Sequence, residues 1–276
     1  MTAMNSPPFR AALAACLALL AGGCSGSADA AETLTLTGSS TVAPLASELA
    51  LRYEATHPGV RIDVQSGGSG RGIADARQGT ADIGMASRAL APDETDLDAH
   101  TVARDGIGLI VHADNAVASL TTGDVRRIYL GEVTDWAELG GSVGPITVVH
   151  KAEGRATLEV FLEHMGLDNK AVDADVVAGE NEQAVKTVAG TPGAIGYVSI
   201  GTAEVDIAAG VAIRTVALDG VAPTAAALAD GSYTLARPLN FVTAGKRSPH
   251  VQAFLDFALA PAQHDLVRRE SFLPAQ

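Results

Sequence analysis

The sequence predicts an α/β fold, and three observations point to it. Short apolar runs of strand length recur from residue 33 onward. Between these runs, apolar residues recur at i, i+3, i+4 and i+7, which is the spacing of one helix face. Loops rich in Gly, Ser and Thr join strands to the helices that follow, at the carboxyl ends of the strands. The length of 276 residues fits one or two domains, and a hydrophobic content of 47% excludes a disordered chain.

The first half of the chain alternates between strands and helices. Apolar residues from Val42 to Tyr53 fall on one face of a helix, which Pro58 and Gly59 end. A short second helix is expected to end at Gln78. The last strand of this half, 106–111, is apolar throughout, which predicts a parallel strand buried on both faces. The strands predicted in this half are 34–37, 60–65, 81–86 and 106–111.

The second half repeats this alternation. Thr121 or Thr122 is expected to cap a helix that runs to Leu130. Near the end of the chain, Ser248 followed by Pro249 predicts another helix start, because Pro suits the first helical position. The other elements predicted here are strands over 145–151 and 194–199 and helices over 158–165 and 251–259.

The N-terminal segment has the pattern of a secretory signal peptide, predicted over residues 1–23. Arg10 supplies the positive charge, and the small and apolar residues that follow it are too few to span a bilayer. The segment ends in a sequence similar to a bacterial lipobox, so we expect Cys24 to be lipidated and 24–32 to form a flexible tether. The alternative is ordinary cleavage after Gly23 or in the Ala-rich stretch beyond it. Either way, the mature chain is expected in the periplasm or at the cell surface.

Composition and charge exclude several classes of function. The chain carries 19 basic and 32 acidic residues, a formal net charge of −13, whereas a nucleic-acid binder needs a basic patch to contact phosphates. Two cysteines exclude a disulfide-rich scaffold and a four-thiolate zinc site. The sequence has no Gly-x-Ser-x-Gly elbow, nucleotide phosphate loop or His-Glu-x-x-His motif. We therefore predict no cofactor, no metal site and no catalytic residue.

Three loops carry the chemistry that points to an anion. They span 38–41, 67–72 and 151–157, and each lies between a predicted strand and a predicted helix. At such a place, hydroxyl groups and free backbone N–H groups meet the positive end of a helix. Ser and Thr also serve as ordinary helix caps and Gly as a turn residue, so one such loop is weak evidence. Three loops at the same end of an α/β layer favour a site for a tetrahedral anion.

The residues of these loops resemble one family throughout the mature chain. The run Gly-Ser-Ser-Thr at 38–41 and the run Ser-Gly-Gly-Ser-Gly at 66–70 are similar to those of the phosphate-binding proteins of bacterial ABC importers. The further segments that match, in order, are 81–88, 128–136, 193–197 and 233–242.

The resemblance implies a two-lobed periplasmic-binding-protein fold of type II. Each lobe would be a mixed sheet flanked by helices, with the ligand cleft between the lobes. The lobe limits expected from it are 33–112 plus 236–276 for the first lobe and 113–235 for the second. It further implies a monomer that is not an enzyme, binds inorganic phosphate and delivers it to the transmembrane subunits of an ABC permease. Its only contact with the membrane would be the lipid anchor.

By the same resemblance, specific residues would contact phosphate. The predicted phosphate-binding residues are Ser39, Ser40, Thr41, Ser69, Ser87, Arg88, Lys151, Arg155 and Thr157. Lys151 stands where the family has an Arg, and Arg155 stands where it has a Ser, whereas Thr157 is retained. Because Lys lacks the two-pronged geometry of Arg, we expect Arg155 at the helix entrance to be the main cation. Trp136 and Tyr197 are expected to be packing residues.

The determinant of selectivity also departs from the family pattern. Many members place an Asp after the third strand, where it accepts the proton of hydrogen phosphate and rejects sulfate, which has no proton to give. This chain has Ser87 and Arg88 there. Asp82 is expected to be a structural hydrogen-bond partner, and Glu153 is another possible acceptor. Sulfate, molybdate or another oxyanion therefore remains open as the ligand, as does a surface adhesion or sensing role on the same fold.

Overall fold

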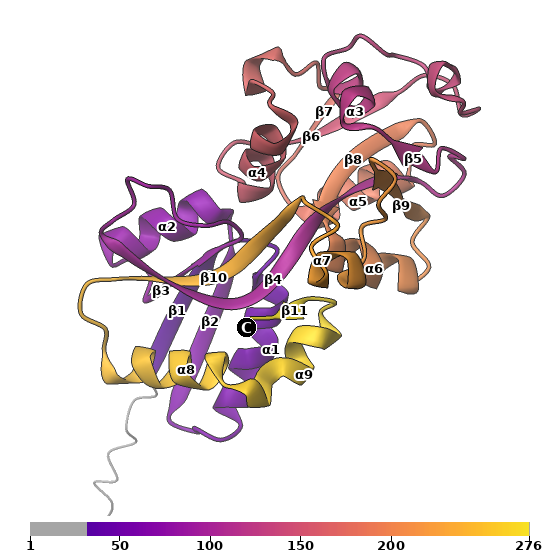
Figure 1. Ribbon diagram of the computed structural model, residues 1–276. Coiled ribbons are helices and arrows are strands. Elements are labelled where there is room, and N and C mark those ends of the chain that lie inside the picture. The colour runs from indigo at the N-terminus through magenta and orange to yellow at the C-terminus, as the bar shows by residue number, and fades with distance from the viewer. Residues whose placement is uncertain (1–31, 276) are drawn as a thin grey trace, which may run out of the picture. The chain divides into compact units, whose positions relative to one another are not determined.

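The computed structural model describes residues 32–275, and Figure 1 shows the order of the elements along the chain. The helices are α1 Ala43–Glu54, α2 Ser69–Gln78, α3 Thr122–Tyr129, α4 Ala156–Met165, α5 Asn181–Ala189, α6 Ile200–Ala208, α7 Ala225–Ala229, α8 Pro249–Leu259 and α9 His264–Arg269. The strands are β1 Glu32–Gly38, β2 Val60–Ser66, β3 Ile83–Ala86, β4 Leu97–His112, β5 Ser119–Leu120, β6 Thr147–Lys151, β7 Val176–Ala178, β8 Ala194–Ser199, β9 Ile213–Leu218, β10 Ala236–Ala244 and β11 Leu273–Pro274.

The predicted signal peptide, the lipidation site Cys24 and most of the tether lie outside the described residues. Within residues 32–275, no helix is long and apolar enough to cross a membrane.

The sheet is mixed and carries two α/β lobes. Its strands follow the order β2-β1-β3-β10-β4-β8-β6-β7, and β9 and β11 also pair with β4. We call the part around β1, β2 and β3 the first lobe and the part around β6, β7 and β8 the second lobe. The long strands β4 and β10 lie side by side, and β4 continues from the first lobe into the second, as Figure 1 shows. The residue limits predicted for the lobes stay a prediction.

The direction predicted for the strand at 106–111 is wrong. These residues form the second half of β4, whose partners β8, β9, β10 and β11 all run antiparallel to it. The burial inferred from the apolar run is present, since Ile107 and Leu109–Val111 are fully buried. Helices cover both faces of this part of the sheet, so a continuous apolar run is needed whatever direction its neighbours take.

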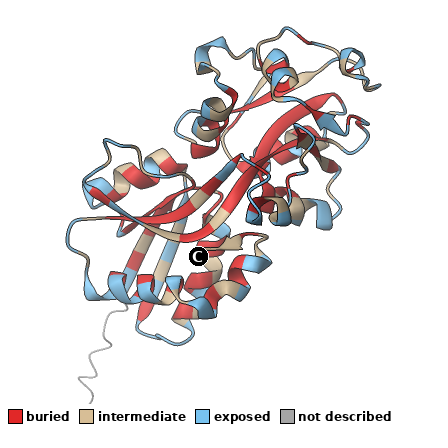
Figure 2. Cartoon of the chain, in the orientation of Figure 1, coloured by how far each residue is buried: buried red, intermediate tan, exposed pale blue. Residues whose placement is uncertain are grey.

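Each lobe has its own apolar core, and Figure 2 shows the buried strands between exposed helix faces. In the first lobe, helices α1, α8 and α9 pack on one face of the sheet, with Leu36, Leu45 and Phe254 fully buried. In the second lobe, the neighbours Tyr197 and Val198 on β8 contribute to different core clusters. Successive side chains of a strand point to opposite faces, so one side packs with α3 and α4 and the other with α5.

The helix boundaries predicted from capping residues are confirmed. Thr121 caps α3 through a reciprocal pair of hydrogen bonds with Asp124. Ser248 caps α8, and Pro249 occupies its first position. The predictions omitted the first part of β4, over 97–105, where polar and apolar residues mix. They also omitted β5, β7, β9, β10, β11 and helices α5, α6, α7 and α9.

Candidate functional site

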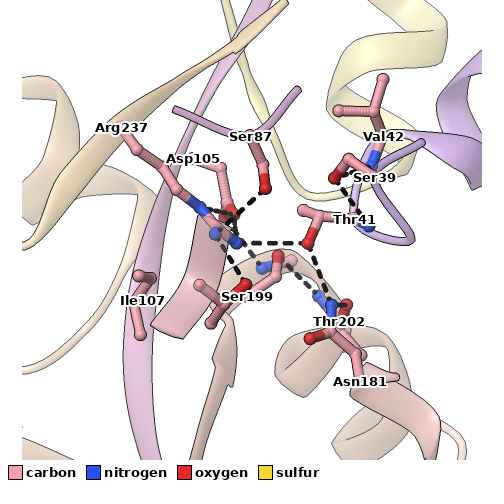
Figure 3. Close-up of polar contacts among 12 residues, drawn as sticks. Ser39, Thr41, Val42, Ser87, Asp105, Ile107, Asn181, Ser199, Thr202 and Arg237 are labelled. Atoms are coloured by element: carbon pink, nitrogen blue, oxygen red, sulfur yellow. Dashed lines mark hydrogen bonds and ion pairs between the residues drawn. The ribbon is translucent and has the colours of Figure 1, made fainter. Parts of the chain in front are cut away.

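Buried polar side chains from both lobes meet at the ends of β1, β3 and β6. We call this group the polar cluster, and Figure 3 shows part of it. Its members are Ser39, Thr41, Ser69, Ser87, Asp105, Lys151, Thr157, Asn181 and Arg237, and none is more than 5% exposed. Buried polar groups are costly unless they are paired. Nine buried polar side chains in one place therefore indicate a ligand site rather than ordinary core.

The fold places four of these residues at or next to helix N-termini. Thr41 lies in the loop between β1 and α1, and Ser69 is the first residue of α2. In the second lobe, Thr157 is the second residue of α4, and Asn181 is the first residue of α5. The first N–H groups of a helix have no partner inside the helix, and the helix dipole adds a partial positive charge there. The cluster therefore lies where backbone electrostatics favour an anion.

Arg237 hydrogen-bonds to residues in both halves of the cluster. Its Nη1 donates to Thr157 Oγ1 in the second lobe at 2.8 Å and to Ser87 Oγ in the first lobe at 3.3 Å. Its Nη2 donates to Thr41 Oγ1 at 3.2 Å and to Asp105 Oδ2 at 2.9 Å. Arg237 and Asp105 are register partners on β10 and β4, which fixes the guanidinium between the lobes.

Hydrogen bonds within the protein leave two hydroxyl groups of the cluster, those of Thr41 and Ser39, as donors. Thr41 Oγ1 accepts from Arg237 Nη2 and from Asn181 Nδ2, at 3.2 and 3.1 Å. Ser39 Oγ likewise accepts from two backbone N–H groups, at 3.2 and 3.3 Å. A hydroxyl has two lone pairs and one hydrogen, so each of these groups has only its O–H left to offer. Such a site suits a ligand that is rich in acceptors.

Lys151 adds a second buried cation. Its Nζ donates to the Glu180 backbone oxygen at 3.0 Å and to Asn181 Oδ1 at 3.1 Å. Among the described residues, no carboxylate forms an ion pair with it. Burial, followed by the nearby Arg237, lowers the pKa of Lys151 from 10.5 to about 7. With Lys151 protonated, the two cations exceed the single Asp105 carboxylate, so the cluster carries a net positive charge.

Three of the predicted phosphate-binding residues lie outside the polar cluster. Arg155 forms an ion pair with Glu180, Nη1 to Oε1 at 2.6 Å, and its stem packs over Gly68. Arg88 is paired with two carboxylates, and Ser40 lines an open hollow of about 400 Å³. The geometry does not support the prediction that Arg155 is the main cation, because Arg237 holds the central position.

The other six predicted residues, Ser39, Thr41, Ser69, Ser87, Lys151 and Thr157, all lie in the cluster. Sequence reasoning missed Arg237, Asp105 and Asn181. A signal was present for the first two, since each is a charged residue next to a run of apolar strand residues. Such a charge in a buried strand must find a partner, although the sequence does not say which one.

Neither of the carboxylates considered from the sequence lies in the cluster. Asp82 is exposed, and its Oδ2 accepts from Thr35 N at 2.8 Å, which confirms the structural hydrogen bond. Glu153 is exposed as well, and its Oε1 accepts from Asn169 Nδ2 at 3.3 Å. Asp105 is thus the carboxylate of the cluster. Among residues 32–275, no group of three or more His, Cys, Asp or Glu side chains could hold a metal ion.

Buried aromatic residues lie next to the cluster in the second lobe. Tyr197 is buried and stacks on Phe161 with ring centroids 3.8 Å apart. Its Oη accepts from the backbone N–H of Lys151 at 3.3 Å, which helps to fix the end of β6. Trp136 is fully buried and donates from Nε1 to Gly193 O at 2.8 Å. Both aromatic residues are therefore packing residues, as predicted.

Known proteins are similar to this chain in sequence and in fold. Two curated phosphate-binding proteins named PstS are similar to the chain. The one from Bacillus subtilis is 29% identical over 255 residues, covering 90% of this chain and 83% of that protein. The one from Borreliella burgdorferi is 25% identical over 257 residues, covering 89% and 91%.

Solved structures agree. A putative phosphate ABC transporter substrate-binding protein from Clostridium perfringens, with bound phosphate, has a TM-score of 0.83 and 30% identity, covering 89% of this chain and all of that one. An ABC-type phosphate transport receptor from Vibrio cholerae has a TM-score of 0.72 and 28% identity, covering 88% of this chain and all of that one. The family model described as the PBP superfamily domain matches residues 24–262, so the chain belongs to the PBP superfamily.

Proposed function

We propose that this protein is an extracytoplasmic solute-binding protein that captures inorganic phosphate in the polar cluster and delivers it to an ABC permease. One observation carries the proposal. Arg237 and Asn181 occupy the lone pairs of Thr41, so this buried hydroxyl presents its hydrogen beside the Arg237 cation, and Asn181 in turn accepts from the Lys151 cation. Hydrogen phosphate offers acceptor oxygens and negative charge, which complement these groups. The names of the similar proteins support the same ligand.

Capture would proceed by closure of the two lobes on the anion. The first lobe contributes Thr41, Ser69 and Ser87, the second contributes Lys151 and Thr157, and Arg237 would contact the anion between them. A ligand that contacts both lobes stabilises the arrangement in which they meet, so binding shifts the population toward it. Exclusion of water then strengthens each charge-assisted hydrogen bond. No step in this mechanism changes a covalent bond, so we do not propose an enzyme.

Asp105 would provide the preference for phosphate over sulfate. Its Oδ2 is held by Arg237, and its Oδ1 has only a long contact, 3.5 Å, with the Gly201 backbone N–H. Hydrogen phosphate can donate its proton to this oxygen, whereas sulfate would face a carboxylate with no proton between them. The role that the sequence analysis could not assign to Asp82 or Glu153 would therefore fall to Asp105.

The remaining features of the transport role rest on the sequence. We propose that Cys24 is lipidated after removal of 1–23, that the tether holds the protein at the outer face of the membrane, and that it acts as a monomer. The two lobes would span 33–112 plus 236–276 and 113–235.

Calorimetry of the ligand-stripped chain tests the proposal. We expect tight binding of inorganic phosphate near neutral pH and much weaker binding of sulfate. Thr157→Val removes a hydroxyl of the cluster with little change in volume and should weaken phosphate binding about tenfold or more, since it also leaves a donor of Arg237 without its acceptor. Arg71→Met is the matched control, because Arg71 is exposed and pairs with Asp75.

Three results would count against the proposal. Sulfate binding as tight as phosphate binding would show that Asp105 does not select. Unchanged affinity in Thr157→Val would place the ligand elsewhere. If no oxyanion bound at all, the adhesion or sensing role would be favoured.

A further inference from the structure

Arg88, which the sequence analysis assigned to phosphate, forms an ion pair between the lobes. It lies in the loop that follows β3 in the first lobe, and its Nε is 2.6 Å from Oε2 of Glu159. Glu159 belongs to α4, in the second lobe. The Arg88 side chain is only 16% exposed, whereas that of Glu159 is 42% exposed. The pair therefore lies at the boundary between lobe surface and interior.

The guanidinium of Arg88 is fixed to the first lobe before it contacts the second. Its two Nη atoms donate to the two carboxylate oxygens of Glu94, at 2.8 and 2.9 Å. Glu94 is itself held by the backbone N–H of Ala91, at 2.7 Å, and its pKa is lowered chiefly by the hydrogen bond from Arg88. Nη1 and Nη2 thus pair with Glu94 of the first lobe, and Nε is the atom whose ion-pair distance to α4 is short.

The Arg88–Glu159 pair adjoins the polar cluster on both sides. Arg88 follows Ser87 in the chain, and Glu159 is two residues beyond Thr157, which accepts from Arg237. Arg88 and Glu159 line one cavity of about 450 Å³ together with Arg237. The pair can therefore form only when α4 lies against the first lobe, which is also the arrangement that joins Thr157 to Arg237.

We propose that Arg88 is a positioning residue, whose ion pair with Glu159 stabilises the closed arrangement of the lobes and slows release of the bound anion. This inference rests on the proposed capture of phosphate. Two carboxylates already surround Arg88, so a phosphate at its guanidinium would face like charges. The ion pair acts instead by adding a contact that is lost on opening.

Removal of the Glu159 charge separates this role from direct binding. Glu159→Gln removes a negative charge close to the anion site, and by electrostatics alone it should strengthen phosphate binding. If Arg88 bound phosphate itself, release from Glu159 should strengthen binding too. The positioning role predicts the opposite: weaker binding by about two- to fivefold, which is the range measured for partly exposed ion pairs. The loss should appear in the dissociation rate, and it should shrink at high salt.

The experiment measures inorganic phosphate affinity and dissociation rate in the full chain at low and high salt. The variants are Glu159→Gln, Arg88→Met and the two combined, and the control is Asp96→Asn, which breaks the exposed pair of Arg77 with Asp96 inside the first lobe. We expect the Glu159 substitution to have no further effect once Arg88 is replaced, and the control to have none at all. Tighter binding or an unchanged dissociation rate in Glu159→Gln would overturn the inference.

A distance measurement keeps the inference testable if the wild type fails to bind phosphate, which would overturn the proposed function separately. The chain has 2 cysteines, Cys16 and Cys24, so spin labels can be placed at chosen sites once both are replaced by Ser. Leu51 on α1 and Val177 on β7 are exposed and lie in different lobes. Without phosphate, Glu159→Gln should shift the label-to-label distances toward longer values, whereas Asp96→Asn should not. Identical distributions would refute the role of the ion pair in closure.

Discussion

The affinity for phosphate is expected to depend on the protonation of Lys151. This lysine is buried, no described carboxylate forms an ion pair with it, and its pKa without ligand is lowered to about 7, so about half the molecules carry its charge at pH 7. A phosphate dianion beside Nζ would raise this pKa again, because an opposite charge favours the charged form. Binding therefore takes up about half a proton at pH 7 and nearly a whole proton at pH 9.

The size of the effect follows from the depressed pKa. Well above pH 7, each pH unit costs about tenfold in affinity, since the free protein must first gain a proton. Near pH 7 the dependence is shallower, because half the molecules are already charged. Between pH 7 and pH 9 the contribution of Lys151 should fall by roughly 50-fold, or about 2 kcal/mol.

Calorimetry of the wild type and of Lys151→Met at pH 7, 8 and 9 measures this contribution. Phosphate titrates in the same range, but its own titration cancels in the ratio of the two affinities. The ratio should decline by about the factor above. Repeating the titration in buffers of different ionisation enthalpy should show proton uptake by the wild type in excess of the variant. A ratio that stays constant from pH 7 to 9, or proton release, would refute the reasoning.

Three further predictions concern the groups around the anion. Lys151 should also make the ligand-free protein more stable as pH rises from 7 toward 10, because the folded state holds fewer protons than the unfolded state in that window. The free energy of unfolding in urea should therefore increase by about 2 kcal/mol from pH 7 to 9, relative to that of Lys151→Met. Asn181→Asp replaces the amide that donates to Thr41 with an acceptor, which would take the Thr41 hydroxyl proton away from the anion. The phosphate affinity measured by calorimetry should fall at least tenfold. An unchanged affinity would show that Thr41 does not donate to the ligand. Gly68→Ala should weaken phosphate binding, because a Cβ there would lie 2.8 Å from the backbone oxygen of Gly154 in the facing loop. Gly79→Ala is the control, since Gly79 also has a positive φ but has open space around it. It should lower the free energy of unfolding by only about 1 kcal/mol and leave the phosphate affinity unchanged.

The local part of the site could be predicted from the sequence. Thr41, Ser69 and Thr157 lie in short loops between periodic segments, and the spacing of their neighbours is enough to place them at helix N-termini. Arg237 and Asp105 could not be joined in this way, because 132 residues separate them and only the pairing of β10 with β4 brings them together.

Arg155 shows that a cation in the expected loop can be paired with a neighbouring carboxylate. It occupies the expected loop, yet the carboxylate that pairs with it, Glu180, follows a short strand that the sequence did not reveal. Local spacing gives the place of a side chain along the chain but not its direction. The strand at 106–111 illustrates the same limit, since its apolar residues indicate burial and carry no information on strand direction.

The pairing of Arg237 with Asp105 links recognition of the anion to the connection between the two lobes. The cation that would meet the anion is held on β10 by a carboxylate on β4, and β4 is the strand that continues from one lobe into the other. A substitution at either residue would therefore alter both the affinity and the stiffness of the connection on which the lobes move. A change in phosphate affinity that leaves the motion of the lobes unaltered would have to come from the hydroxyl groups of the cluster. A change in the release rate that leaves the contacts with the anion unaltered would have to come from the Arg88–Glu159 pair.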